Sequence, residues 1–218
     1  MKVDIEKEIQ QSAEDAARKI RELLAARKVF AVNLISSPGS GKTTLIEAAI
    51  EALRGRKRIA VVEGDIETDI DSARIRKHGV QAHQINTRSS CHIQPFVLLS
   101  ALDNIDLGAT DLLFVENVGN LVCPAEVPLG EDMRVVALSV TEGDEKPLKY
   151  PLVFRTSDVL VITKTDLLPY VKFDPERVKS AARAVNPGIG IFEVSAATGS
   201  GLPAFLEGIE AACDRKIG

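Results

Sequence analysis

The hydrophobic residues of the chain form short β-branched runs that alternate with segments of helical periodicity. Runs such as VVALSV and VLVIT are apolar at almost every position, which is typical of strands buried on both faces of a parallel sheet. The pattern predicts about seven strands, near residues 29–35, 58–63, 80–85, 112–116, 134–140, 159–163 and 191–194. Helices are expected near residues 42–54, 69–78, 89–102, 145–156, 174–185 and 201–215. This alternation predicts a doubly wound α/β domain with a mostly parallel sheet and flanking helices.

The N-terminal part of the chain has a different pattern. Its apolar residues recur at helical spacing with charged residues between them: Ile5, Ile9, Ala13, Ala16, Ile20, Leu23 and Leu24. An amphipathic helix of this kind buries its apolar side against another element. We therefore expect residues 1–28 to form a helix packed on the domain and residues 29–218 to form the domain itself.

Charge and composition narrow the classes of function. The 27 Lys and Arg residues against 31 Asp and Glu leave a net charge of −4, which argues against nucleic-acid binding. No apolar stretch approaches the ~20 residues of a membrane span, and the first residues carry charges where a signal peptide needs an apolar run. The sequence thus predicts a cytoplasmic protein with no membrane partner. Its odd number of cysteines, three, is expected to stay reduced.

A phosphate-binding loop is predicted between the first strand and the next helix. The segment SSPGSGKTT, residues 36–44, matches G-x-x-x-x-G-K-[ST] except that Ser36 replaces the first glycine. The glycines would turn backbone N–H groups toward phosphate oxygens, Lys42 would reach the β- and γ-phosphates, and the Thr43 hydroxyl would ligate Mg²⁺. An ordinary Gly-rich turn is the alternative. The predicted nucleotide-binding residues here are Ser37, Pro38, Gly39, Ser40, Gly41, Lys42, Thr43 and Thr44.

Two further segments indicate which base is bound. Residues 163–166 read TKTD and resemble the N-K-x-D motif of GTPases, with Thr163 in place of Asn. The carboxylate of Asp166 would accept hydrogen bonds from guanine N1–H and the exocyclic amine, a donor pair that adenine lacks. The stem of Lys164 would cover the base, and Ser195-Ala196 opens a segment similar to the loop that closes over guanine. TKTD alone could be a helix cap, but the ordered pair of motifs favours GTP over ATP.

Acidic residues follow two of the predicted strands. Asp65 comes after the second strand, and the fourth strand ends in Glu116 with Gly119 three residues later. An apolar strand ending in Glu-x-x-Gly resembles the Walker B segment of a dimerising class of P-loop proteins. We predict that Asp65 and Glu116 join Thr43 in organising Mg²⁺ and that Gly119 approaches the γ-phosphate. These two acids, Lys42 and Gly119 are the catalytic candidates; loop solvation and helix capping are the alternative roles for the acids. No glutamine is placed to orient water, so slow intrinsic hydrolysis is expected.

A metal site is predicted beside the nucleotide. Cys91 and His92 are adjacent at the expected start of a helix, and Cys123 lies seven residues after Glu116. Both segments leave the edge of the parallel sheet that holds nucleotide, and two thiolates with an imidazole suit Zn²⁺ or Ni²⁺. Three ligands are too few for a closed tetrahedral site, and a dimer could place two such sets face to face. Taken singly, each cysteine could instead be a core residue.

Six segments, in this order, closely resemble the HypB family: SSPGSGKTTL, EGDIETDIDSARI, CHIQP, DLLFVENVGNLVCPAE, VTEGDEKPLKYP and TKTDLLPY. The resemblance runs from about residue 29 to the C-terminus. It implies a GTPase of nickel insertion into [NiFe]-hydrogenase that dimerises with GTP and handles Ni²⁺ or Zn²⁺ at the dimer interface. Cys91, His92 and Cys123 match the family's metal site. Lys149 matches a lysine that reaches the nucleotide of the partner subunit, although a solvated helix lysine is the alternative.

The resemblance also implies a partner that receives nickel, either another maturation protein or the precursor of the hydrogenase large subunit. One departure is that residues 1–28 hold no His or Cys, so a separate N-terminal metal site is not expected. Cys213, His78 and His83 match no functional motif and are predicted to be structural or solvated.

Two other functions remain open. A related GTPase serving urease or a cobalamin enzyme is disfavoured because the urease relative uses a Cys-Pro-His motif, whereas Cys91-His92 and Cys123-Pro124 are separate here. A P-loop kinase acting on a small molecule would usually need an Arg-rich lid, and the chain offers only scattered arginines such as Arg74, Arg76 and Arg88.

Overall fold

The computed structural model describes residues 2–65, 70–87 and 90–218, and its centre is a seven-stranded sheet. The strand order is β3-β2-β4-β1-β5-β6-β7 and every neighbouring pair is parallel. The strands are β1 (Phe30–Ser36), β2 (Ile59–Asp65), β3 (Gln81–Asn86), β4 (Leu112–Glu116), β5 (Met133–Ser139), β6 (Val159–Thr163) and β7 (Gly190–Val194). The predicted parallel α/β fold is confirmed, and each strand end lies within two residues of its predicted position.

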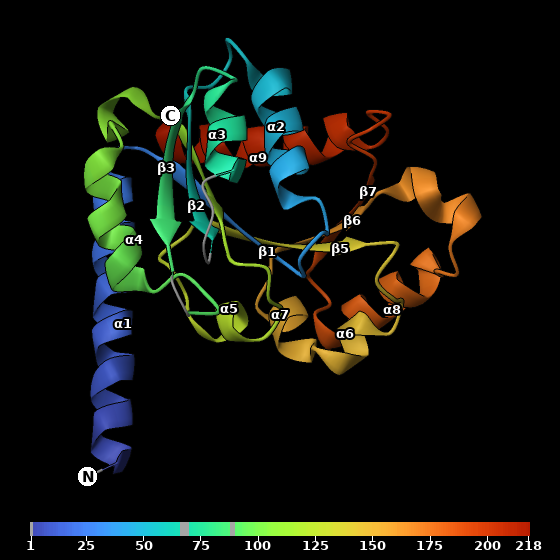
Figure 1. Ribbon diagram of the computed structural model, residues 1–218, viewed down its shortest axis with the longest axis horizontal. Helices are drawn as coiled ribbons and strands as arrows, with labels where there is room; N and C mark the ends of the chain where they lie inside the picture. The colour runs from blue at the N-terminus through green and yellow to red at the C-terminus, as the bar shows by residue number, and fades with distance from the viewer. Residues whose placement is uncertain (1, 66–69, 88–89) are drawn as a thin grey trace.

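Helices cover both faces of this sheet (Figure 1). They are α1 (Lys2–Ala26), α2 (Lys42–Leu53), α3 (Ile70–Arg76), α4 (Pro95–Ala101), α5 (Cys123–Glu126), α6 (Lys146–Lys149), α7 (Pro151–Arg155), α8 (Pro175–Val185) and α9 (Leu202–Ile217). Three short 3₁₀ turns span Leu102–Asn104, Leu107–Ala109 and Thr165–Tyr170. One face packs against α2, α3 and α9; on the other, α1 and α4 cover one half and α7 and α8 the other half. The nearly continuous burial of β1, β4 and β6 follows from this two-sided cover.

Two predicted helices differ from those observed, and proline explains both. The helix expected over 89–102 begins only at Pro95, with Gln94 extended before it, so Cys91 and His92 lie in a bend ahead of the helix. The helix expected over 145–156 is divided into α6 and α7 at Tyr150, whose φ of −126° is not helical, directly before Pro151. A residue that precedes proline is pushed away from helical backbone angles. Positions 69 and 89, where two of the predicted helices begin, and Arg88 lie outside the described residues.

The N-terminal helix α1 runs beside α4, and its first turns extend past the rest of the fold (Figure 1). Ala17, Ile20 and Leu24 are buried in this contact region. Gly130, whose φ is +83°, lies directly against the helix: a Cβ atom there would be 2.3 Å from the carbonyl oxygen of Ala17. Only glycine therefore permits this close approach. Within the described parts of the chain, no helix combines the length and apolar character needed to cross a membrane.

Candidate functional site

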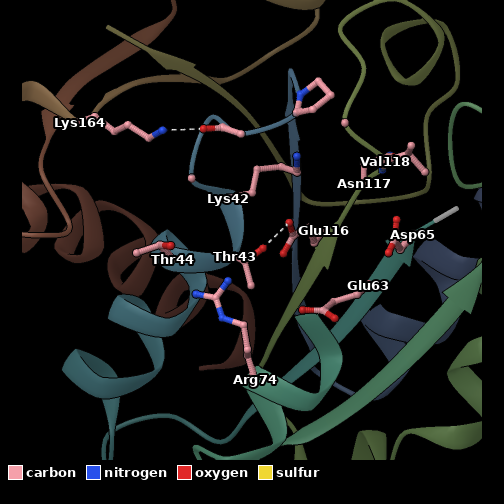
Figure 2. A pocket seen from close by; sticks show the side chains of 15 residues that line it. Lys42, Thr43, Thr44, Glu63, Asp65, Arg74, Glu116, Asn117, Val118 and Lys164 are labelled. Atoms are coloured by element: carbon pink, nitrogen blue, oxygen red, sulfur yellow. Dashed lines mark hydrogen bonds between the residues drawn. The ribbon is translucent and has the colours of Figure 1, made fainter. Parts of the chain in front are cut away.

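The carboxyl ends of the strands border a cleft of about 530 Å³ (Figure 2). Its walls come from the loop between β1 and α2, the ends of β2 and β4, α3, and the residue that follows β6. In an open parallel sheet, ligands bind outside the carboxyl ends of the strands, where helix N-termini also point. The cleft is therefore where the fold itself favours binding of an anion.

The loop between β1 and α2 has the backbone that a phosphate cradle needs. Gly39 and Gly41 have φ of +75° and +91°, values at which a residue with a Cβ is strained. Lys42 is buried, and its ammonium group donates to the hydroxyl of Ser36 over 2.9 Å. The serine that stands in place of the first motif glycine thus holds the lysine close to the loop.

Oxygen ligands converge on the Thr43 side of the cleft. The Thr43 hydroxyl donates to Glu116 Oε1 over 2.9 Å, and Glu63 and Asp65 extend from the end of β2 into the same space (Figure 2). A hydroxyl among carboxylates is the hard, all-oxygen set that Mg²⁺ prefers. The residues present therefore fit a magnesium ion bound together with a nucleotide.

Gly119 lies against the phosphate loop. A Cβ atom at this position would be 2.9 Å from Pro38 Cγ and 3.0 Å from Pro38 Cα. The segment that follows β4 can therefore touch the loop only because residue 119 has no side chain.

A second cavity of about 330 Å³ adjoins the loop on the side of β6, and Asp166 and Ala196 are among its lining residues. Asp166 Oδ1 accepts a hydrogen bond from Ser195 Oγ at 2.5 Å. Lys164 has a φ of +59°, and its ammonium group donates to the carbonyl oxygen of Gly39 over 2.7 Å. Thr163 Oγ1 donates to the carbonyl of Ser40, also over 2.7 Å. The cavity thus has the position and the acceptor expected of a guanine pocket next to the phosphate loop.

Cys91, His92 and Cys123 form a cluster in which one ligand atom from each residue lies within 4.8 Å of the others. The hydrogen bond to Cys123, and then burial, raises the pKa of the Cys91 thiol. Burial lowers the pKa of His92, which favours the neutral imidazole that ligates metals. The amide of Gln94 lies 2.8 Å from His92 Nε2, and His92 Nδ1 lies 3.7 Å from Cys91 Sγ. Nδ1 is therefore the ring nitrogen next to the Cys91 thiol.

The structure brings the predicted site residues into three adjoining groups, with one exception. Lys149 lies on α6, lines neither of the two cavities described above, and is exposed. Its ammonium group pairs with Glu145 over 2.8 Å, a hydrogen bond that raises the pKa of Lys149. In the described chain it therefore does not reach the nucleotide cleft of its own subunit.

Several residues of the site were not predicted from the sequence. Arg74 and Asn117 line the nucleotide cleft. Glu142 Oε1 accepts a hydrogen bond from Ser40 Oγ at 2.6 Å, and Asn120 donates to the carbonyl oxygen of Cys91. Only their positions in the sequence could have pointed to these residues. Asn117 directly follows Glu116, and Glu142 lies in the segment VTEGDEKPLKYP.

The all-parallel seven-stranded sheet, with a Gly-rich loop after β1 and a cleft at the carboxyl ends of its strands, is that of a P-loop NTPase of the SIMIBI class. A family model described as "CobW/HypB/UreG, nucleotide-binding domain" matches residues 30–193. The chain belongs to the HypB family of hydrogenase maturation factors, so the resemblance noted in the sequence is confirmed.

Individual relatives give the extent of the similarity. The chain is 48% identical over 206 residues to "Hydrogenase maturation factor HypB" of Azotobacter vinelandii, covering 94% of this chain and 68% of that protein. It is 38% identical over 208 residues to the probable HypB of Methanocaldococcus jannaschii, covering 95% and 94%.

Two solved structures support the fold. The crystal structure of HypB from Helicobacter pylori in complex with nickel matches with a TM-score of 0.90 and 36% identity, over 94% of this chain and 97% of that one. The signal recognition particle receptor FtsY from Elizabethkingia anophelis matches with a TM-score of 0.54 and 12% identity, over 88% and 72%, which supports the fold alone.

Proposed function

We propose that this protein is a GTP-hydrolysing metallochaperone that binds Ni²⁺ or Zn²⁺ and delivers nickel during maturation of [NiFe]-hydrogenase. One observation carries the proposal: a single segment, residues 116–123, contributes to both the nucleotide cleft and the metal cluster. Glu116 at its start bonds Thr43, and Cys123 at its end joins Cys91 and His92. A change of nucleotide that shifts this segment would therefore move a metal ligand.

The nucleotide half of the function follows from the cleft. The backbone of residues 37–44 and Lys42 would hold the phosphates, and Asp166 with Ser195 and Ala196 would select guanine. Thr43, Asp65 and Glu116 would hold Mg²⁺, which when bound neutralises charge on the β- and γ-phosphates. Among the described residues that line the cleft there is no glutamine to orient water. Intrinsic hydrolysis is therefore expected to be slow, as suits a switch.

The metal half needs a second copy of the chain. Cys91, His92 and Cys123 offer three ligand atoms, one fewer than a closed tetrahedral site requires. Two facing copies would complete the coordination and would place Lys149 of each copy toward the nucleotide of the other. The crystallised relative that binds nickel supports Ni²⁺ as the cargo. The recipient would be a cytoplasmic maturation protein or the precursor of the hydrogenase large subunit.

The test is the nickel affinity of the purified chain, measured with a GTP analogue and with GDP. The proposal predicts different affinities in the two states. Equal affinities would overturn it.

Variants separate the two halves. Cys91→Ala and Cys123→Ala should lose nickel binding and any metal-driven dimer in light scattering, while they keep GDP binding. Cys213→Ala is the matched control because this buried thiol lies outside the cluster and should change neither. Lys42→Ala should show the reverse pattern, with GTP binding lost and nickel retained in the nucleotide-free protein.

A further inference from the structure

Asn117 lies between the nucleotide cleft and the metal cluster. It directly follows Glu116, lines the cleft, and is only 1% exposed. Its Oδ1 accepts two backbone hydrogen bonds, one from the N–H of Ile93 at 3.1 Å and one from the N–H of Val118 at 3.0 Å. Ile93 is the residue after the metal ligand His92. One buried amide therefore ties the end of β4 to the loop that carries two of the three ligands.

The same isoleucine is held from a second strand. A Cβ atom on Gly64, near the end of β2, would lie 2.5 Å from Ile93 Cγ1, so the isoleucine side chain occupies the space that this glycine leaves. Gly64 also lines the nucleotide cleft. Ile93 is thus bonded through its backbone to Asn117, directly after β4, and packs through its side chain against Gly64 of β2.

The nitrogen of the same Asn117 side-chain amide enters a buried polar network. Its Nδ2 donates to Asn33 Oδ1 over 3.3 Å, and Asn33 in turn donates to Glu131 Oε1 over 3.1 Å. Glu131 pairs with Arg134, whose guanidinium donates to the carbonyl oxygen of Ala125 on α5. Since α5 begins at Cys123, the network returns to the third ligand. Satisfied polar networks in a low-dielectric interior act as a unit more than as separate bonds.

Asn120 offers a contrast within the same segment. Its Nδ2 donates to the carbonyl oxygen of Cys91 over 3.3 Å, and its Oδ1 accepts from the N–H of Val122. It supports the metal loop without lining the nucleotide cleft. Loss of the Asn120 side chain would thus remove support from the metal loop while leaving the bond between Asn117 and the Ile93 N–H in place.

From these contacts we propose that Asn117 is the positioning residue that transmits nucleotide state to the metal ligands, through its hydrogen bond to the Ile93 N–H. This inference rests on the function proposed above. A shift of the β4 end on binding the γ-phosphate moves the Asn117 amide, and the bend that holds Cys91 and His92 follows it. The coupling is reciprocal, so nickel changes the affinity for GTP by the same factor.

The experiment measures the Ni²⁺ affinity of the full chain with GTPγS and with GDP, read from nickel–thiolate charge-transfer absorption. For the unmodified chain we expect the two affinities to differ by about 5- to 150-fold, the usual range of allosteric coupling. Asn117→Ala is expected to bring this ratio close to one. Asn120→Ala is expected to weaken nickel binding in both states by one common factor and to leave the ratio unchanged. A purely structural role for Asn117 would instead give the Asn120→Ala pattern.

Gly64→Ala supplies a second route if Asn117→Ala does not fold. It displaces the Ile93 side chain from β2 and is also expected to reduce the ratio. If either variant folds and keeps the full ratio of the two nickel affinities, the inference is overturned. The proposed function then remains intact. A ratio of one in the unmodified chain overturns the proposed function as well, so the two failures are distinguishable.

Discussion

At the scale of single residues, the two residues that differ from the usual nucleotide-binding motifs, Ser36 and Thr163, both make hydrogen bonds to the phosphate loop. Ser36 replaces a glycine, and its hydroxyl accepts from the Lys42 ammonium group. Thr163 replaces an asparagine, and its hydroxyl donates to the carbonyl oxygen of Ser40 in the phosphate loop. Both side chains are buried, so each bond is shielded from competing water. The departures therefore preserve the tie between the loop and its surroundings.

Thr163→Val tests the second of these contacts. The change removes the hydroxyl at nearly constant volume and leaves a buried carbonyl oxygen without its donor, at a cost of about 1–3 kcal/mol. Since that carbonyl belongs to the loop, binding of both GDP and GTP is expected to weaken about tenfold, the equivalent of ~1.4 kcal/mol. Titration calorimetry measures the affinities for GDP and for GTP. Thr163→Ser keeps the hydroxyl and should bind as the unmodified chain does; equal affinities for the Val variant would contradict the argument.

Cys213 gives a prediction on pH. Burial raises the pKa of the Cys213 thiol to about 11, well above the usual value of a cysteine. A thiol with a raised pKa in the folded state stabilises the fold below the unfolded pKa, and that stabilisation is lost as pH rises toward the folded pKa. The unmodified chain should therefore lose stability between about pH 9 and pH 11.

The measurement is guanidinium unfolding at each pH. In Cys213→Ala the free energy of unfolding is lower at every pH, because the buried sulfur is removed. Its decrease between about pH 9 and pH 11 is smaller, because the thiol no longer contributes to it. If both chains lose stability with the same slope, the assignment to Cys213 is wrong.

At the scale of elements, the segment after β4 is constrained from two sides. Gly119 touches Pro38 of the phosphate loop, and the asparagines at 117 and 120 hold the bend before α4. Pro95 at the first position of α4 explains why this bend is not helical. Cys91 and His92 therefore sit on short irregular backbone, and Cys123 begins the four-residue helix α5. Short segments of this kind outside the sheet can shift without disrupting it.

Gly119→Ala tests the contact with the phosphate loop. The new methyl group would lie within 3.0 Å of backbone atoms of Pro38, which cannot turn aside as a flexible side chain can. We expect GTP hydrolysis to fall by at least about tenfold, whereas GDP binding changes less because GDP lacks the phosphate nearest this contact. Phosphate release under single-turnover conditions is the measurement.

The matched control is Gly208→Ala, in the exposed middle of α9, where the nearest atom would be 3.6 Å away. It should leave hydrolysis unchanged and stabilise the fold by about 0.5–1 kcal/mol. If Gly119→Ala also hydrolyses GTP at an unchanged rate, the contact between Gly119 and the phosphate loop does not matter for hydrolysis, and the argument is wrong.

At the scale of the whole molecule, parallel topology gathers the chemistry at one edge of the sheet. Residues far apart in the chain, among them Lys42, Asp65, Glu116 and Asp166, meet there because every described strand ends on the same side. An acidic chain with a net charge of −4 can hold a polyphosphate at this edge, since oriented N–H groups, a helix N-terminus and Lys42 supply local positive potential.

Ligand-dependent stability tests this edge as a unit. GDP with Mg²⁺ at 100 times its Kd should raise the free energy of unfolding by about 2.7 kcal/mol, because it binds only the folded chain. ADP at the same concentration should have little effect. In Asp166→Ala, GDP and ADP should stabilise the fold equally. Thermal unfolding with each nucleotide measures the effect in both chains. Equal stabilisation by ADP and GDP in the unmodified chain would contradict guanine selection.

The seven strands and the phosphate loop could be predicted because their signals are local: continuous apolar runs, and glycines at fixed spacing before Lys42. The start of α4 could not be placed by periodicity, which extended the helix back over Cys91 and His92. The role of Asn117 could not be predicted at all, since an asparagine after a strand is equally compatible with a turn. Its partner, the N–H of Ile93, is 24 residues away in the chain.

The sequence by itself determined the parallel α/β class, the phosphate loop and the family, because buried strands and short motifs depend on neighbouring residues. Only the tertiary structure decided that Cys91, His92 and Cys123 form one cluster and that Lys149 pairs with Glu145 and lines neither cavity. The same holds for the hydrogen bond of Asn117 to the Ile93 N–H. These facts depend on which strands are neighbours in the sheet, where β2 and β4 pair although about fifty residues separate them. Burial of the apolar faces of the helices sets that arrangement, and no local pattern encodes it.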